Sequence, residues 1–259
     1  MISSRWLKVL AIVLMTVDHV GFILLSEGTT EYIILRIIGR LSYPLFALII
    51  AYGCTRTRNI SMYFLRLIAF AVILQICWAA AGLINEDLKP EFNNIFFTLA
   101  FGVLAIWFIK YMRRGAPMKN TTDLIVFTIF AILFTAILCV CAGFLQVDYG
   151  AAGVLLIVMF YSVLDTIYRV PKRYSDVSNL TKDWVLRIVA PLVCLIIFNV
   201  VISLWYNVWG TQWFSMLSAP LIWLFVPKKL KIHWLEKYAF YIYYPLHFIV
   251  LIGISLLII

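Results

Sequence analysis

The stretch LKVLAIVLMTVDHVGFILL, residues 7–25, decides the fold class. At about 1.5 Å per residue it is long enough to cross a hydrocarbon core about 30 Å thick as a helix. An acid and an imidazole, Asp18 and His19, lie within it. Because ionisable groups at this depth are costly, they are retained where something offsets the cost. The pair is therefore the first candidate for a functional site.

The rest of the chain repeats this apolar pattern. Of its 259 residues 64% are hydrophobic and 13% are charged, and the mean hydropathy is +1.01. These values predict an all-α, polytopic integral membrane protein. We expect about nine transmembrane helices forming one bundle with an intramembrane polar cavity, in a single domain over residues 1–259. The expected spans are 6–26, 33–53, 60–82, 95–111, 121–142, 150–168, 184–205, 211–226 and 238–258.

The eighth expected span is the weakest, because the Trp- and Tyr-rich stretch before it is typical of a headgroup-level belt beside a short or re-entrant segment. The first span lacks a small-residue cleavage site, so we expect it to be retained rather than removed as a signal peptide. No connection is long enough for a soluble domain, which places any chemistry within or at the membrane.

Basic residues are distributed unevenly between the two sets of connections. All but three of the 21 Lys and Arg residues fall on the side of the N-terminus, and the exceptions are Arg36, Arg40 and Lys89. Short cytoplasmic loops are rich in Lys and Arg. We therefore expect a protein of the bacterial cytoplasmic membrane with its N-terminus in the cytoplasm and its C-terminus outside. The net charge of +9 reflects this topology and not a nucleic-acid partner.

The five cysteines and three histidines form no metal-ligand pattern. There is no CxxC, and no His/Cys cluster has ligand spacing. We expect free thiols packed as small apolar groups, and no metal.

Helix geometry gives the depth of the polar residues. Asp18 and His19 lie roughly 10 to 12 Å below the outer end of their span, and Arg40 lies about 10 Å below the outer end of the next one. Arg36 shares a face with Arg40, four residues on. Because a short loop joins the two helices, an acid, an imidazole and a guanidinium fall at one level, and Asp18 is expected to pair with Arg40.

Further polar groups approach this level from other spans. An outward-facing pocket with its floor near His247 would be lined by Arg36, Arg40, Tyr43, Asn93, Asn94, Asp148 and Tyr149. Structural roles remain open for the same residues. Asp18 and Arg40 can form a purely structural ion pair, and either histidine can serve only to connect helices through hydrogen bonds.

Several strings, in their order and spacing, resemble the TraX family over nearly the whole chain. They include LKVLAIVLMTVDHVG (7–21), RIIGRLSYPLFALIIAYG (36–53), NIFFTLAFG (94–102), VDYGAAGVLLIV (147–158) and AFYIYYPLHFIVL (239–251). The resemblance implies a bacterial membrane protein, and the family's namesake is associated with N-terminal acetylation of conjugative pilin. It also implies a distant relation to transmembrane acyltransferases such as heparan-α-glucosaminide N-acetyltransferase, in which a membrane-embedded histidine takes part in moving an acetyl group across the membrane.

The resemblance assigns roles to particular residues. His19 matches the catalytic base, Asp18 would orient it, and His247 is the second catalytic candidate. Arg36 and Arg40 would line the same cavity. The acceptor, a glycan, a lipid or a peptide N-terminus, does not carry over.

This chemistry suits the residues present. A neutral imidazole can accept the proton of an attacking amine or hydroxyl, and Arg40, Tyr43 or Asn94 could donate to the oxyanion. The donor would be acetyl-CoA, whose phosphates are too polar to enter the bilayer. Its expected docking points are therefore basic residues of the inner loops, which otherwise only set topology: Arg56, Arg58, Arg113 and Arg114.

Two other functions compete with an acetyl-CoA-dependent acyltransferase. One is a proton-coupled transporter or flippase using Asp18, Arg40 and His247. The other is a non-catalytic membrane scaffold. Hydrolysis of the thioester or a thermal shift with acetyl-CoA favours the enzyme, and uptake driven by a pH gradient favours the transporter.

Overall fold

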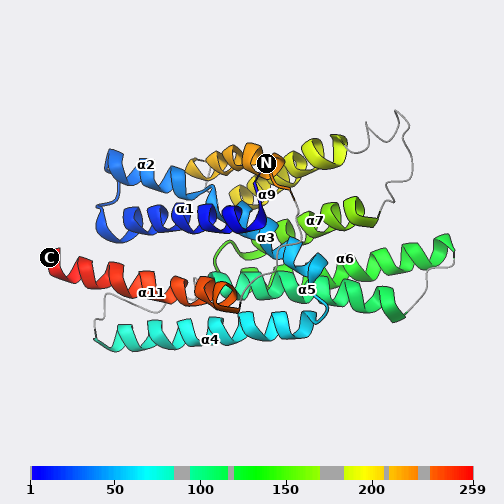
Figure 1. The fold of residues 1–259 in the computed structure, drawn as a ribbon, viewed down its shortest axis with the longest axis horizontal. Helices are drawn as coiled ribbons and strands as arrows, with labels where there is room; N and C mark the ends of the chain where they lie inside the picture. The colour runs from blue at the N-terminus through cyan, green and yellow to red at the C-terminus, as the bar shows by residue number, and fades with distance from the viewer. Residues whose placement is uncertain are drawn as a thin grey trace.

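A computed structural model shows a bundle of helices that run roughly along one axis (Figure 1). It describes residues 2–84, 94–115, 120–169, 184–206, 210–226 and 234–258. The long helices are α1 Ser4–Leu24, α4 Ile60–Ile84, α5 Ile95–Gly115, α6 Thr121–Phe144, α7 Gly150–Arg169 and α11 Trp234–Ile258. The shorter ones are α2 Thr30–Gly39, α3 Ser42–Arg56, η1 Val185–Val189, α9 Ala190–Tyr206, η2 Thr211–Ser218 and α10 Ala219–Trp223.

Within the described residues, 8 helical segments are long and apolar enough to cross a membrane. The all-α, polytopic membrane fold expected from the sequence is therefore confirmed. Eight of the nine expected spans correspond to these segments. The exception is 211–226, where a short 3₁₀ helix, η2, is followed by the five-residue helix α10.

Although short, η2 and α10 connect two distant levels of the bundle. The chain enters them from Tyr206, whose hydroxyl lies against Gly150 at the start of α7. It leaves them at Leu224 and Val226, which exchange backbone hydrogen bonds of 2.7 and 2.9 Å with Ile2, next to the N-terminus. A 3₁₀ helix rises about 2 Å per residue, so this short segment covers more length than an α-helix of the same size.

The second expected span is broken in the middle. One apolar stretch, Thr30–Arg56, contains α2 and α3, which are separated at Arg40 and Leu41. Pro44 explains the break, because it has no N–H to donate to the carbonyl of Arg40 and its ring crowds that carbonyl.

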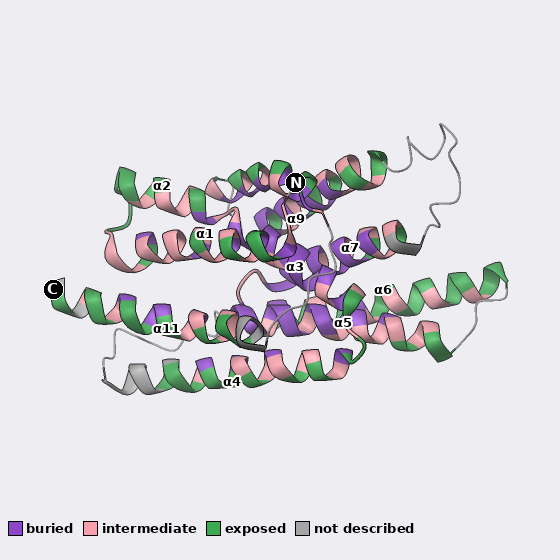
Figure 2. Ribbon diagram, viewed as in Figure 1, coloured by how far each residue is buried: buried purple, intermediate pink, exposed green. Residues whose placement is uncertain are grey.

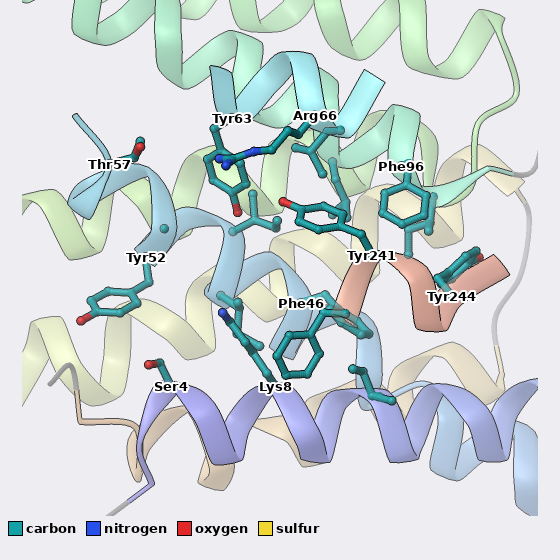
Figure 3. A pocket seen from close by; sticks show the side chains of 18 of the residues that line it. Ser4, Lys8, Phe46, Tyr52, Thr57, Tyr63, Arg66, Phe96, Tyr241 and Tyr244 are labelled. Atoms are coloured by element: carbon teal, nitrogen blue, oxygen red, sulfur yellow. The ribbon is translucent and has the colours of Figure 1, made fainter. Parts of the chain in front are cut away.

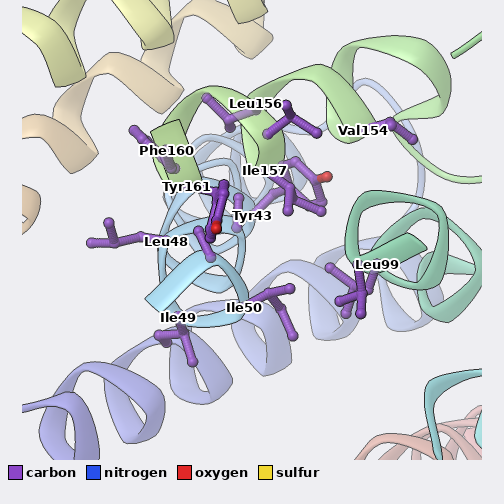
Figure 4. Close-up of a cluster of buried hydrophobic side chains, with 14 of the residues drawn as sticks. Tyr43, Leu48, Ile49, Ile50, Leu99, Val154, Leu156, Ile157, Phe160 and Tyr161 are labelled. Carbon is purple, nitrogen blue, oxygen red and sulfur yellow. The ribbon is translucent and has the colours of Figure 1, made fainter. Parts of the chain in front are cut away.

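Burial is concentrated in the middle of the bundle. Figure 2 shows buried residues mainly on α3, α5 and α7, and exposed residues on the outlying helices. Large aromatic and branched side chains of α3 and α7, including Tyr43, Leu48, Phe160 and Tyr161, interlock there (Figure 4). By contrast, α6 exposes Ile125, Ile132 and Val140. An apolar exposed surface of this kind fits contact with lipid.

Close approach of α5 and α7 depends on two glycines. A Cβ atom at Gly102 of α5 would overlap Ile157 of α7, and one at Gly153 of α7 would overlap the Thr98 side chain of α5. Small residues of this kind let helix backbones approach closely within a membrane.

The topology expected from the basic residues leads to a labelling prediction. Single cysteines at Glu27, between α1 and α2, and at Arg58, between α3 and α4, should react from opposite sides of the membrane, Glu27 from outside. The measurement is labelling of intact cells with a membrane-impermeant maleimide, in a background without the five native cysteines. Labelling of both positions from one side would contradict the topology.

Candidate functional site

Two histidines far apart in the sequence meet between α1 and α11. Nδ1 of His19 lies 2.7 Å from Nε2 of His247, and the two rings are stacked with centroids 4.9 Å apart. His247 is buried. The two catalytic candidates expected from the sequence are therefore direct neighbours.

The hydrogen-bond network assigns the protons of the pair. Nδ1 of His247 lies 3.1 Å from the backbone oxygen of Tyr243. A carbonyl oxygen only accepts, so this Nδ1 carries the hydrogen, and a neutral His247 has a lone pair at Nε2. Nδ1 of His19 must then be the donor of the 2.7 Å bond. In neutral His19 the basic lone pair is consequently at Nε2.

A second contact holds the same two helices in register. The Thr16 hydroxyl donates to the carbonyl oxygen of Ile12 at 2.9 Å, so it accepts the 2.8 Å hydrogen bond from the Tyr243 hydroxyl. The Tyr243 ring also stacks on His247, with an interplanar angle of 7°. These contacts fix the position of His247 relative to α1.

A cavity of about 720 Å³ lies between α1, α3, α4, α5 and α11. At one end it is lined by Ser4 and Lys8 near the start of α1 and by Arg56 and Thr57 at the end of α3. We call this the basic end. Arg66 of α4 lies on the wall opposite Lys8 (Figure 3).

The other end of the cavity is apolar and close to His19. It is lined by Met15, Phe96 and Tyr244. Met15 precedes His19 by four residues, which is about one helical turn. The ring of Tyr244 meets the His19 ring edge-on, with centroids 5.9 Å apart. A ligand that enters at the basic end can therefore extend to within one aromatic ring of the histidine pair.

The expected ion pair of Asp18 forms with a different arginine. Oδ2 of Asp18 lies 2.5 Å from Nη1 of Arg36, and their side chains are 14% and 17% exposed. The prediction that Asp18 pairs with Arg40 was therefore wrong. The remaining oxygen, Oδ1, is buried without a hydrogen-bond partner in the described part of the chain.

The break between α2 and α3 accounts for this choice. The Asp18 side chain packs against Gly39, where a Cβ atom would overlap the carboxylate. Arg36 lies one turn earlier on the regular part of α2 and reaches this carboxylate, whereas Arg40 follows the last residue of the helix. Arg40 is turned towards Tyr149 and Asp148, and it interacts with Asp18 only through its charge.

Asp148 and Tyr149 lie in the connection between α6 and α7, outside the membrane spans. Burial raises the pKa of Asp148 to about 7, although the nearby Arg40 guanidinium lowers it. With Asp18, Arg36 and Arg40 they form a set of acids and bases that we call the polar cluster. It lies on α1, α2 and the α6–α7 connection.

Two other residues expected to line an outward-facing pocket, Tyr43 and Asn94, instead pack or hydrogen-bond within the bundle. Tyr43 is fully buried, and its ring stacks on Tyr149 at 3.9 Å between centroids. The Asn94 side chain donates to the carbonyl of Ala71 at 2.8 Å and accepts from the backbone N–H of Phe96 at 3.1 Å. Asn94 therefore links α4 to the start of α5. Asn93 lies outside the described residues.

The four expected docking residues for the donor are separated in the structure. Arg56 lines the cavity, whereas Arg58 and Arg114 are exposed and lie away from it. Arg113 forms an ion pair with Asp165 and lies over the Phe127 ring.

Sequence reasoning missed Lys8, Arg66 and Tyr244 as cavity residues. Lys8 and Arg66 were interpreted only as topology signals. Their positions within apolar helices, rather than in loops, were the available clue.

Comparisons with known proteins agree with the resemblance found in the sequence. The family model described as "TraX protein" matches residues 3–255. A relative from Dichelobacter nodosus, named "Probable fimbrial assembly protein FimC, serogroup H1", is 32% identical over 251 residues, covering 95% of this chain and 92% of its own length. No solved structure matches the chain.

The partner of Asp18 can be tested by stability. Asp18→Asn should lower the free energy of unfolding by about 1 to 3 kcal/mol, between the values for exposed and fully buried pairs. Adding Arg36→Gln should recover much of this loss, because it removes the unpaired charge. Thermal unfolding in detergent is the measurement. Recovery by Arg40→Gln instead of Arg36→Gln would show that Arg40 is the true partner.

Proposed function

The chain belongs to the TraX family, and from this membership together with the site geometry we propose that it is a membrane-embedded acyltransferase. It transfers an acetyl group from acetyl-CoA, bound from the cytoplasm, to an amine or hydroxyl acceptor at the outer side. The observation that carries the proposal is a cavity that is basic at one end and reaches the neighbourhood of His19 at the other.

The two ends of the cavity suit the two parts of a coenzyme A thioester. Three cationic side chains, Lys8, Arg56 and Arg66, contribute to its lining, and the described lining contains no acidic residue. Charge-assisted contacts of this kind favour phosphate groups. The apolar end, at Met15 and Phe96, suits the less polar arm and the thioester. We place the phosphates near Lys8 and Arg56 and the thioester towards His19.

The reaction needs one base that later acts as an acid. Nε2 of His19 takes the proton of the acceptor amine or hydroxyl as its nitrogen or oxygen attacks the thioester carbonyl. The tetrahedral intermediate collapses with cleavage of the C–S bond. His19 returns the proton to the departing sulfur, which leaves acylated acceptor and free coenzyme A.

His247 acts through His19 in this scheme and is a positioning residue. Nε2 of His247 accepts the hydrogen bond from Nδ1 of His19. This bond keeps the reactive lone pair of His19 on the other ring nitrogen of His19, its Nε2. The same bond stabilises the imidazolium formed during proton transfer. Asp18, expected from the sequence to orient His19, instead hydrogen-bonds Arg36. We assign Asp18 to the acceptor side with the rest of the polar cluster.

The acceptor remains a glycan, a lipid or a peptide N-terminus. The name of the Dichelobacter nodosus relative refers to fimbrial assembly. This name favours a pilus-related process and, among the three acceptors, the N-terminal amine of a fimbrial subunit.

The base is tested by substitution of the two histidines. His19→Ala should abolish acceptor-dependent release of coenzyme A thiol while the protein remains folded. General acid–base catalysis contributes about 10² to 10⁴-fold, so His247→Ala should cost less than His19→Ala but still a measurable part of this factor. His247→Gln can still accept from Nδ1 of His19 through its amide oxygen, so it should retain more activity than His247→Ala.

The measurement uses purified protein in proteoliposomes, with acetyl-CoA and a peptide that has a free N-terminal amine, and an amino sugar tested in parallel. Near wild-type transfer by His19→Ala would refute the assignment of the base. Uptake driven by a pH gradient, without thioester cleavage or a thermal shift with acetyl-CoA, would favour the transporter.

The basic end gives a separate prediction. Lys8→Gln combined with Arg56→Gln should raise the KM for acetyl-CoA about tenfold or more, since charged hydrogen bonds contribute about 1.5 to 3 kcal/mol each. The kcat should change less, because these contacts are remote from the reacting bond. Arg58→Gln, which alters an exposed arginine outside the cavity, is the matched control. Equal effects of the control and the double variant would contradict a donor site at this end.

A further inference from the structure

Tyr244 forms part of the apolar end of the cavity. It is 7% exposed, and its ring is held by surrounding aromatic side chains. The Phe96 ring meets it edge-on at 5.1 Å between centroids, His247 at 5.3 Å, and Phe248 lies tilted at 5.4 Å. The ring therefore has a fixed place at the point where the cavity comes closest to the histidine pair.

The other side of Tyr244 faces a different environment. Its hydroxyl points away from the basic end of the cavity (Figure 3). Its electrostatic neighbours are Asp148, Tyr149 and Asp18, all from the region of the polar cluster. One side chain thus lines the cavity on one side and lies within the electrostatic reach of the polar cluster on the other.

A membrane protein with such an arrangement needs a barrier at this position. A cavity open at the basic end and a polar cluster near the opposite end would together offer a hydrated path for protons and water. Apolar constrictions block such paths by excluding water. In a transfer reaction the barrier also matters chemically, because water that reaches the thioester competes with the acceptor.

We propose that Tyr244 is the seal between the donor cavity and the polar cluster, and that it determines specificity for the acceptor over water. This role rests on the proposed acyl transfer for its chemical part, whereas the barrier itself does not depend on it. The aromatic ring is the essential part, since it fills the space between Phe96 and His247. The hydroxyl is not needed for closure.

The barrier is tested in proteoliposomes that contain a trapped pH-sensitive dye and carry an imposed pH gradient. Tyr244→Ala should raise the rate of proton leak several-fold over wild type, and Tyr244→Phe should leave it unchanged. Tyr241→Ala is the matched control, because Tyr241 lines the same cavity but stacks on Phe70 at 4.9 Å. It should enlarge the cavity without opening the seal.

The chemical part is tested on the same samples by hydrolysis of acetyl-CoA without acceptor. Tyr244→Ala should raise this hydrolysis several-fold relative to Tyr244→Phe. A leak without hydrolysis in any variant would support the barrier and refute the role of Tyr244 in specificity over water, whereas acceptor-dependent release of coenzyme A on the same samples decides the acyltransferase separately. A Tyr244→Ala protein that leaks protons no faster than wild type would overturn the seal, whatever its rate of acetyl-CoA hydrolysis.

If Tyr244→Ala does not fold, cysteine labelling tests the seal instead. In a background without native cysteines, Met15→Cys should react with an impermeant maleimide only from the cytoplasmic side when Tyr244 is present. With the milder Tyr244→Leu it should also react from outside. Reaction from outside with Tyr244 intact would overturn the seal.

Discussion

Inside a hydrocarbon layer polar groups have hydrogen-bond partners only within the protein, and this constraint shapes the whole molecule. The backbone meets it through helices, which satisfy their own N–H and C=O groups. Polar side chains satisfy this constraint by pairing with one another. Asp18 contacts Arg36, and His19 contacts His247. Helices that carry few such groups, such as α6, expose apolar surface and lie at the edge of the bundle.

Two adjacent residues of α1 consequently face different neighbours. Successive side chains on a helix point about 100° apart, so Asp18 is turned to α2 while His19 is turned to α11. The first belongs to the polar cluster and the second to the histidine pair near the apolar end of the cavity. In the proposed reaction, Asp18 on the acceptor side and His19 on the donor side are therefore neighbours in the sequence of α1.

Depth along a helix was predictable from the sequence, but rotation and partners were not. Counting residues placed Asp18, His19 and Arg40 at one level, whereas Asp18 pairs with Arg36, one helical turn before Arg40, so depth was predicted to within about one turn. It could not choose Arg36 over Arg40, since the choice depends on where α2 ends, and Pro44 sets that break through the carbonyl it leaves unpaired. His19 and His247 meet across 228 positions, which no local pattern predicts. Lys8 and Arg66 resembled topology signals because a sequence does not show whether a basic side chain faces a cavity or a loop.

The backbone bonds between Ile2 and the segment at Leu224 and Val226 have a consequence for biogenesis. Membrane proteins are made from the N-terminus onwards, so the first helix enters the bilayer long before its strand-like contact and its histidine partner exist. Until the last helix is inserted, Asp18 can already meet Arg36, but His19 has no His247. A ribosome-bound intermediate thus holds a paired charge and an incomplete histidine pair. In the proposed reaction, the nascent protein therefore lacks the partner of its base until synthesis is nearly finished.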